Sequence, residues 1–271
     1  FLIAANRGCT GVVKLLIQGG CNLQPKSEFG RNGLMMAAQE GNDDIVKLLI
    51  EEGVSVNASD DCSKMTALMI ACCMGHAKTA ELLLETGCDK DVKNSYGNSA
   101  FGLASCQKQE KALETLKILF KHGCDPHASG YIGKTETSSL LRAVYYDSVD
   151  IVRFLLYQCH CDVNFKQDGW PALMWAIEWQ SIKSTHVLLD HGSCDINGKY
   201  KGGWTPLMLA SYWGCISIVK RMLQYPHIIV DAQDSKGKTA LNWAFERGHT
   251  DIADMLVEKG NSAYQARYWE P

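Results

Sequence analysis

A short apolar motif recurs along the chain at nearly constant spacing. The intervals between successive copies are 33, 34, 33, 39, 33, 34 and 34 residues. Self-similarity at a period of roughly 20–50 residues is the signature of a stacked repeat array. The pattern therefore predicts eight copies of one unit, each packed on its neighbours. The leading positions of the eight copies are Phe1, Leu34, Leu68, Phe101, Leu140, Leu173, Leu207 and Leu241.

A single copy, residues 33–59, predicts two short helices joined by a turn. The run 34–39 suits a first helix, and Gly41 supplies the left-handed conformation that ends it. Apolar residues at 45–49 form one stripe of a second helix. The Asn-Asp-Asp segment at 42–44 should supply a capping oxygen and negative charge at the start of that helix. Because neither helix is long enough to be stable alone, each must bury its stripe against the next copy.

The repeated motif resembles the ankyrin repeat. The copies that carry the resemblance are Gly-Trp-Thr-Pro-Leu-Met-Leu-Ala-Ser at 203–211 with Gly214, Thr-Ala-Leu-Met-Ile-Ala at 66–71 with Gly75-His76, and Thr-Ala-Leu at 239–241 with Gly248-His249. The resemblance covers residues 1–264. It implies an all-α solenoid of about eight stacked helix-turn-helix repeats with β-hairpin-like loops. It also implies a protein-binding scaffold or adaptor module that performs no catalysis.

We expect one array over residues 1–264 and a C-terminal tail over 265–271. Because Phe1 already lies inside the first, incomplete repeat, we expect a monomeric array within a longer chain. The predicted repeats are about 1–29, 30–59, 60–93, 94–128, 129–165, 166–198, 199–233 and 234–264.

Two features depart from the family pattern. The signature His after the leading Leu is absent, and Met35, Met69, Met174 and Met208 take its place in four copies. In the family that His ties neighbouring repeats by hydrogen bonds, whereas Met should fill the space with a flexible apolar chain. The 39-residue interval predicts two insertions, one around residues 107–110 and one over 129–135. Insertions in repeat arrays go to surface loops, either as drift in a tolerant loop or as part of a binding face.

Composition narrows the function classes. A hydrophobic content of 46% with 21% charged residues is ordinary for a folded domain. The net charge of −3, without a cluster of Lys and Arg, disfavours nucleic acid as a partner. Apolar runs fall far short of the ~20 residues that span a bilayer, so we expect no membrane insertion.

The twelve cysteines are interpreted as reduced structural thiols. Adjacent stacked layers are about 8–10 Å apart, too far for the ~2.3 Å Zn–S bonds of a shared metal ion. We therefore expect no metal, no disulfide and no cofactor, and a cytoplasmic location with the nucleus as the alternative. Scattered histidines and acids that suit helix caps predict no catalytic constellation, so the chain should not be an enzyme. Five cysteines share one repeat position: Cys21, Cys88, Cys124, Cys161 and Cys194.

The candidate binding site is an aromatic groove on repeats five to seven. Large aromatics occupy the end of the first helix three times running, and loop tryptophans that each follow a Gly should lie on the same side. Trp and Tyr are enriched among residues that dominate binding energy. In the family, this helix end and the loop tips commonly form a concave binding face. The predicted partner-binding residues are Tyr145, Tyr146, Trp170, Glu178, Trp179, Trp204, Tyr212, Trp213, Glu246 and Arg247.

Three interpretations of this surface stay open. The first is a site for a partner protein or peptide. The second is a regulatory sensor that binds a small ligand or nucleotide oligomer by stacking, with Arg247 and Lys201 facing phosphates. The third is a spacer whose aromatics only pack on one another. Trp175 and Trp243 occupy the family's apolar helix position, so we expect them in the core.

Two turns resemble a modification site. Asn164 in Asp-Val-Asn and Asn197 in Asp-Ile-Asn are similar to the asparagine that an asparaginyl hydroxylase modifies in some ankyrin proteins. The alternative is an Asn whose side chain bonds a turn.

Overall fold

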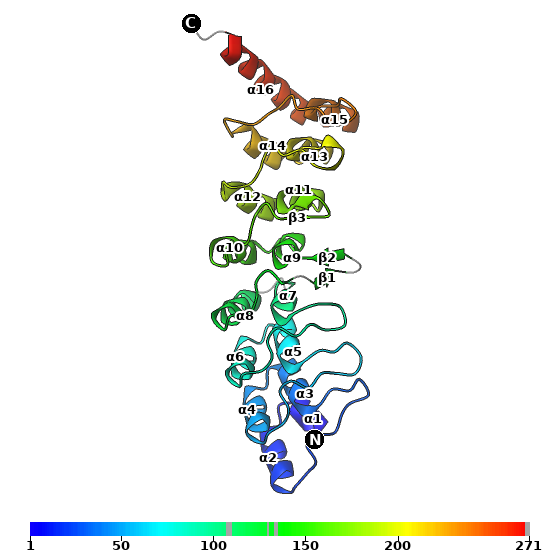
Figure 1. Ribbon diagram of the computed structural model, residues 1–271, viewed down its shortest axis with the longest axis vertical. Coiled ribbons are helices and arrows are strands. Elements are labelled where there is room, and N and C mark those ends of the chain that lie inside the picture. Colours follow the sequence, from blue (N-terminus) through cyan, green and yellow to red (C-terminus); the bar gives the residue numbers. More distant parts are fainter. Residues whose placement is uncertain (107–109, 129, 133–134, 269–271) are drawn as a thin grey trace. The chain divides into compact units, whose positions relative to one another are not determined.

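The computed structural model describes residues 1–106, 110–128, 130–132 and 135–268. Its α-helices form eight successive pairs, and two short antiparallel hairpins lie in the loops (Figure 1). The pairs are α1 (Leu2–Asn6) with α2 (Thr10–Gln18), α3 (Gly33–Glu40) with α4 (Asp43–Glu51), α5 (Ala67–Met74) with α6 (Ala77–Glu85), α7 (Ala100–Ala104) with α8 (Glu110–Lys121), α9 (Ser139–Tyr145) with α10 (Val149–Tyr157), α11 (Ala172–Glu178) with α12 (Ile182–Asp190), α13 (Pro206–Tyr212) with α14 (Ile216–Leu223), and α15 (Ala240–Arg247) with α16 (Thr250–Tyr268). The predicted all-α class of helix-turn-helix repeats with hairpin-like loops is confirmed.

The chain divides into two compact units. Unit 1 comprises Phe1–Ala143 with Tyr157–Cys159, and unit 2 comprises Val144–Leu156 with His160–Pro271. Within unit 1 the first helices of the pairs, α1, α3, α5 and α7, pack in succession, and so do the second helices from α2 to α8 (Figure 1). Within unit 2, α11, α13 and α15 form one row and α12, α14 and α16 the other. Helix α16 continues past residue 264, the predicted end of the array, as far as Tyr268.

The leading apolar residues of the second to seventh copies and the stripes of the second helices form the core. Leu34, Ile45 and Leu49 are fully buried in the second copy. Met35 and Met208, which stand where the family has His, are also buried. Their long apolar chains fill the space between repeats, as expected.

Most first helices begin at side-chain caps, α1 and α11 being exceptions, and several end at glycine. The Thr66 and Thr205 hydroxyls accept hydrogen bonds from Met69 N and Met208 N, satisfying backbone donors that the first turn leaves open. Gly41 ends α3 with φ of +70°, the left-handed region that the sequence predicted there.

The polar tie between repeats sits at a position that the sequence did not indicate. Asn42 was expected to cap α4, but this is wrong, because its side chain makes no capping bond. Instead Asn42 Nδ2 donates to the carbonyl oxygens of Ala5 and Asn6 at the end of α1, both at 2.9 Å. These carbonyls are unpaired at a helix end, so a donor from the next repeat satisfies them.

Histidine plays the same role in two other copies. His76 Nε2 lies 3.0 Å from the Gln39 carbonyl oxygen, and His249 Nε2 lies 3.2 Å from that of Tyr212. Since a carbonyl only accepts, each ring nitrogen donates to the preceding repeat. The stack therefore has its inter-repeat hydrogen bonds although the signature His is missing.

One predicted insertion forms the hairpin of β1 (Gly130–Ile132) and β2 (Thr135–Thr137), while residues 129, 133 and 134 lie outside the described residues. Arg142 of α9 is fully buried beside this hairpin, at the repeat position that holds Ile70 in the third copy. Its Nε donates to Thr137 Oγ1 at 3.1 Å and its Nη2 donates to Asn98 Oδ1 at 2.7 Å. A buried guanidinium thus ties the hairpin to the loop before α7. The other predicted insertion falls on residues 107–109, outside the described residues.

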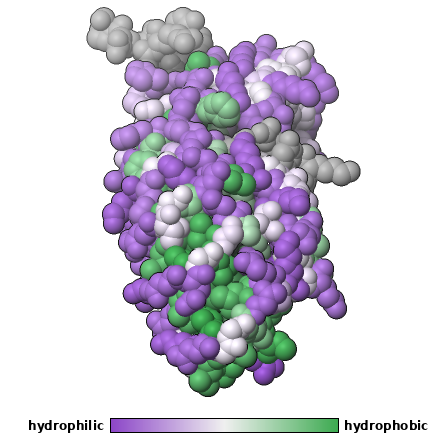
Figure 2. Space-filling model, turned by 60° about the horizontal axis from the view of Figure 1, so that its bottom comes forward, coloured by the Kyte–Doolittle hydropathy of each residue, from purple (hydrophilic) through white to green (hydrophobic). Residues whose placement is uncertain are grey.

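The first helix pair presents an uncovered apolar surface. Ile3 and Leu15 are 71% and 70% exposed, whereas Ile70, at the repeat position of Ile3, is only 3% exposed. Figure 2, in which this end comes forward, shows apolar side chains gathered there. Ile70 is covered because α5, which carries it, packs against α3 of the preceding pair. None of the helices in the described ranges combines the length and apolar content that a membrane crossing requires.

Candidate functional site

The predicted aromatic positions lie together on unit 2, at the ends of its first helices. Tyr145 is the last residue of α9, Trp179 follows α11, and Trp213 follows α13. Arg247 ends α15 in the same register. Tyr146, Trp179, Trp213 and Arg247 each stand six residues after the leading residue of their copy, and Tyr145 stands one residue before Tyr146. Stacking of the repeats therefore brings these positions into one row.

Five rings form a first ring cluster across the fifth and sixth repeats: Tyr145, Tyr146, Trp170, Trp175 and Trp179. Tyr145 meets Tyr146 and Trp179 edge to face, both with ring centroids 5.1 Å apart. Trp179 stacks on Trp175 at 5.0 Å, and Trp175 contacts Trp170 at 5.2 Å. Trp170 is held by β4 (Trp170–Pro171), which pairs with β3 (Lys166–Gln167). These are the separations that favourable ring pairs adopt.

Four rings form a second ring cluster across the seventh and eighth repeats: Trp204, Tyr212, Trp213 and Trp243. Trp204 follows the short 3₁₀ turn Lys201–Gly203 and contacts Trp243 with centroids 4.6 Å apart. The Tyr212 ring lies edge-on to Trp204 and to Trp243. Tyr212 also contacts the Trp213 ring, with centroids 5.2 Å apart. Trp243 is also oriented by a 3.2 Å hydrogen bond from its Nε1 to Asp234 Oδ2.

Charged groups border the second ring cluster. The Arg247 guanidinium lies 4.0 Å from the centre of the Tyr212 ring, and the Lys238 ammonium lies 4.3 Å from that of Trp243. Both separations suit cation–π attraction. Lys238 also pairs with Glu246 at 2.7 Å. Burial raises the pKa of Asp234, but backbone donors at Lys238 and Lys236 outweigh it, so this pKa is lowered and the carboxylate stays charged.

On this side of unit 2, a side-chain hydrogen bond links the sixth repeat to the seventh. Trp213 Nε1 donates to Glu178 Oε2 at 3.0 Å. The two ring clusters, together with Glu178, Glu246 and Arg247, are called the aromatic face below. It spans four successive repeats of unit 2.

The ten predicted binding residues all belong to the aromatic face, but two tryptophans were misplaced. Trp175 and Trp243 were expected in the core, and this is wrong, because both are half-buried and belong to the ring clusters. Sequence reasoning also missed Lys238 over Trp243. The position of Lys238 two residues before the leading Ala-Leu of α15 was the available signal. The rings do pack on one another, as the self-packing interpretation holds. They nevertheless keep exposed area, 45% for Tyr145.

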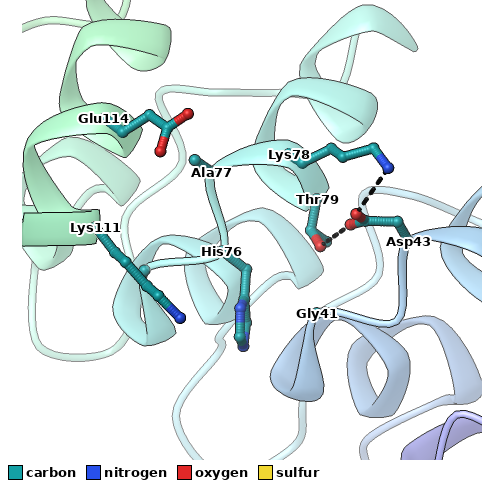
Figure 3. Close-up of a pocket in the computed structure, with 9 residues that line it drawn as sticks. Gly41, Asp43, His76, Ala77, Lys78, Thr79, Lys111 and Glu114 are labelled. Carbon is teal, nitrogen blue, oxygen red and sulfur yellow. Dashed lines mark hydrogen bonds and ion pairs between the residues drawn. The ribbon is translucent and has the colours of Figure 1, made fainter.

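Apart from the aromatic face, a small pocket lies in unit 1, between the starts of α4, α6 and α8 (Figure 3). Its volume is about 240 Å³, below the roughly 300–1,000 Å³ of ordinary ligand pockets. Its polar groups already hold neighbouring repeats together. Asp43 of α4 accepts a hydrogen bond from Thr79 Oγ1 of α6 at 2.6 Å and pairs with Lys78 at 3.2 Å (Figure 3). We assign no function to it.

Burial differs among the cysteines, from buried Cys72 to exposed Cys9. Burial raises the pKa of Cys124 and of Cys194 to about 12, which keeps both protonated at neutral pH. Such thiols are poor nucleophiles and poor metal ligands. No group of three or more metal-binding side chains is found in the part of the chain that the structure describes.

Asn164 and Asn197 bond across repeats. Asn164 Nδ2 donates to the Ser193 carbonyl at 2.6 Å, while its Oδ1 accepts from Asp195 N at 3.0 Å. Asn197 makes the equivalent pair of bonds to His227 and Ile229. These bonds of the Asn164 and Asn197 side chains therefore go to the next repeat, whereas the turn-bonding alternative placed them within the residue's own turn.

Comparison with known proteins agrees with this architecture. A family model described as ankyrin repeats in three copies matches residues 1–94, 60–130, 101–200 and 193–266. The chain belongs to the ankyrin-repeat family.

Similar proteins differ widely in how much of their length matches this chain. A Danio rerio protein named Neurogenic locus notch homolog protein 1 is 26% identical over 190 residues, 65% of this chain but 8% of that protein. The Candida albicans glycerophosphocholine phosphodiesterase GDE1 is 30% identical over 151 residues, 53% of this chain and 13% of that protein. The Escherichia coli putative ankyrin repeat protein YahD is 27% identical over 203 residues, 71% of this chain and 94% of that protein.

Among solved structures, the human ASB11 ankyrin repeat domain superposes with a TM-score of 0.68 at 22% identity, covering 84% of this chain and 98% of that one. This likeness shows the fold. Ankyrin repeats generally bind other proteins, and the fold is typically not catalytic.

Proposed function

We propose that this chain is a non-enzymatic module that binds a partner protein or peptide on its aromatic face. The proposal rests on one observation: the nine aromatic rings of the two ring clusters contact one another across four successive repeats. Large rings ordered before binding lose little conformational entropy when a partner arrives. Tyr, Trp and Arg also dominate binding energies at protein interfaces.

The position of these residues supports the same proposal. Helix ends and loop tips are the parts of a stacked repeat that change most easily without disturbing the core. In unit 1 the matching helix ends carry Gln39-Glu40 and Cys73-Met74, without rings. The concentration of rings on unit 2 is therefore not required by the repeat itself. We propose that this side is the concave binding side and that unit 1 serves as scaffold.

A ligand or nucleotide sensor is less well supported. Stacking of bases requires free ring faces. Trp175 and Trp179 stack on each other, and cations cover faces of Tyr212 and Trp243.

Affinity capture tests the proposal. The chain would be immobilised as wild type, as Trp179→Ala/Trp213→Ala, and as Tyr145→Ala/Arg247→Ala, whose exposed side chains contribute less packing. Tyr157→Ala, on the second helix α10, removes an aromatic of comparable exposure (43%) as the control. We expect wild type and control to retain the same partner and both face variants to lose it, with helical circular dichroism preserved. Equal capture by all four proteins would refute the proposal.

A further inference from the structure

The loops beside the aromatic face carry an excess of positive charge. They are the three segments that precede the first helices of repeats six to eight: 165–170, 199–204 and 233–238. They contain five lysines and two aspartates. One of the aspartates, Asp234, is buried and engaged by Trp243 and by backbone donors, so it contributes little to the outer surface. The lysines are Lys166, Lys199, Lys201, Lys236 and Lys238.

The matching loops of unit 1 lack this excess. Segments 26–31, 60–65 and 93–98 contain four basic and three acidic residues. Two of the basic side chains are neutralised, since Lys26 pairs with Asp61 at 3.0 Å and Arg31 lies 3.6 Å from Asp60. Positive loops are therefore specific to the unit that carries the rings, in a chain whose net charge is −3.

The carboxylates on the aromatic face are already engaged. Glu178 accepts from Trp213 Nε1, and Glu246 pairs with Lys238. Lys201, Lys236 and Arg247 are exposed. A partner that crosses the rings thus meets uncompensated cations along the loop side and at the last repeat.

We infer that the segment bound by the aromatic face is an extended acidic peptide, in which apolar side chains contact the rings and Asp or Glu side chains face the loop lysines. This inference rests on the proposed function. It is argued from charge complementarity, which steers association and selects partners more than it adds raw affinity. An extended strand suits the geometry because its successive side chains point to opposite sides.

The length of the segment follows from the repeat spacing. Four stacked layers at about 8–10 Å span roughly 25–30 Å. An extended chain advances ~3.3–3.6 Å per residue, so about eight or nine residues reach from Tyr145 to Arg247. Alternation of acidic and apolar residues over that length would place four or five carboxylates along the loops.

Nucleic acid also carries negative charge, but it fits this surface less well. Trp175 and Trp179 stack on each other, and the Arg247 and Lys238 side chains lie over the rings of Tyr212 and Trp243. Base stacking therefore has little open ring area, whereas aliphatic and aromatic side chains of a peptide can pack against edges.

Fluorescence anisotropy with defined probes tests the inference. The probes are three labelled peptides of about ten residues, alternating Phe or Leu with Glu, with Gln or with Lys, and an oligothymidylate of similar length. We expect the Glu peptide to bind wild type at least about tenfold more tightly than the Gln peptide. Lys201→Glu/Lys236→Glu should weaken the Glu peptide about tenfold and leave the Gln peptide unchanged. Lys183→Glu/Lys220→Glu, exposed on the second helices α12 and α14, makes the same charge change and should alter binding less than twofold.

Each other outcome overturns the inference in a distinct way. Equal binding of the Glu and Gln peptides, both lost in Tyr145→Ala/Arg247→Ala, would remove the acidic requirement and keep the proposed function. Equal weakening by the loop and helix charge reversals would make the attraction non-specific. Tighter binding of the oligonucleotide would assign the face to nucleic acid. Failure of every probe would overturn the inference, and partner capture would decide the proposed function separately.

Discussion

Trp213 donates its indole N–H to Glu178 across the boundary between two repeats, at 3.0 Å. Trp213 also contacts Tyr212, whose ring lies under Arg247. A single hydrogen bond therefore connects the helix end of the sixth repeat with the second ring cluster. Partner binding and repeat packing use the same side chains at this point.

The Trp213–Glu178 bond should contribute measurably to stability. A double-mutant cycle of Trp213→Phe and Glu178→Ala should give a coupling free energy of about 0.5–1.5 kcal/mol, because both side chains are half-buried and the acceptor is charged. Urea unfolding followed by circular dichroism measures it. Strictly additive single effects would show that the bond contributes nothing.

The tie made by His76 should be replaceable by asparagine. His76→Ala removes the donor to the Gln39 carbonyl and should cost about 1 kcal/mol. His76→Asn should recover most of this, since Asn42 makes the equivalent bond at the same repeat position. Melting temperatures of the two variants check the prediction. If asparagine were as damaging as alanine, ring packing rather than hydrogen bonding would explain the role of His76.

Two glycines with the same backbone conformation should respond differently to alanine. Gly214 and Gly248 have φ of +71° and +77°, so alanine at either adopts a strained left-handed conformation at a cost of about 1 kcal/mol. A Cβ added at Gly214 would also lie 2.5 Å from the His249 ring. A Cβ added at Gly248 would meet no described atom within 4 Å. Gly214→Ala should therefore lower the melting temperature more than Gly248→Ala does. Equal shifts would mean that His249 moves aside freely.

Stability should decline between pH 9 and pH 12 in part through two buried thiols. Burial raises the pKa of Cys124 and of Cys194 from 9.0 to about 12, so the unfolded chain loses these protons at lower pH than the folded protein. The stabilisation is fully present below pH 9 and is lost as the pH rises towards 12. Cys124→Ala/Cys194→Ala should show a shallower fall in melting temperature from pH 8 to pH 10.5. An unchanged slope would contradict the assignment.

The repeat architecture was predictable because it depends on many weak, redundant signals. Eight leading apolar residues, glycine at the end of several first helices and one apolar stripe per second helix all indicate the same unit. The inter-repeat bonds of Asn42 and His76 were not predictable in this way. A residue after a glycine suits a helix cap equally well, and only the position of the neighbouring carbonyls distinguishes a cap from a tie. The buried Arg142 was missed because a charge in an apolar column requires partners that the repeat pattern does not indicate: Asn98, which is 44 residues away, and Thr137 in the inserted hairpin.

The candidate site was predictable in its residues and not in its contacts. Repeat register alone places Tyr146, Trp179 and Trp213 in one row. Whether Trp175 and Trp243 turn into the core or onto the face depends on side-chain rotation, which periodicity does not fix. The cations over Tyr212 and Trp243 likewise depend on how two loops and a helix end meet.

Site-specific photo-crosslinking in cells that express the protein tests the central claim most directly. A photoreactive amino acid would replace Tyr145 or Arg247 on the aromatic face, or Tyr157 or Lys220 on the second helices α10 and α14. The account predicts that one partner is crosslinked from both face positions and from neither second-helix position. Crosslinking of that partner from Tyr157 and Lys220, with none from Tyr145 and Arg247, would contradict it.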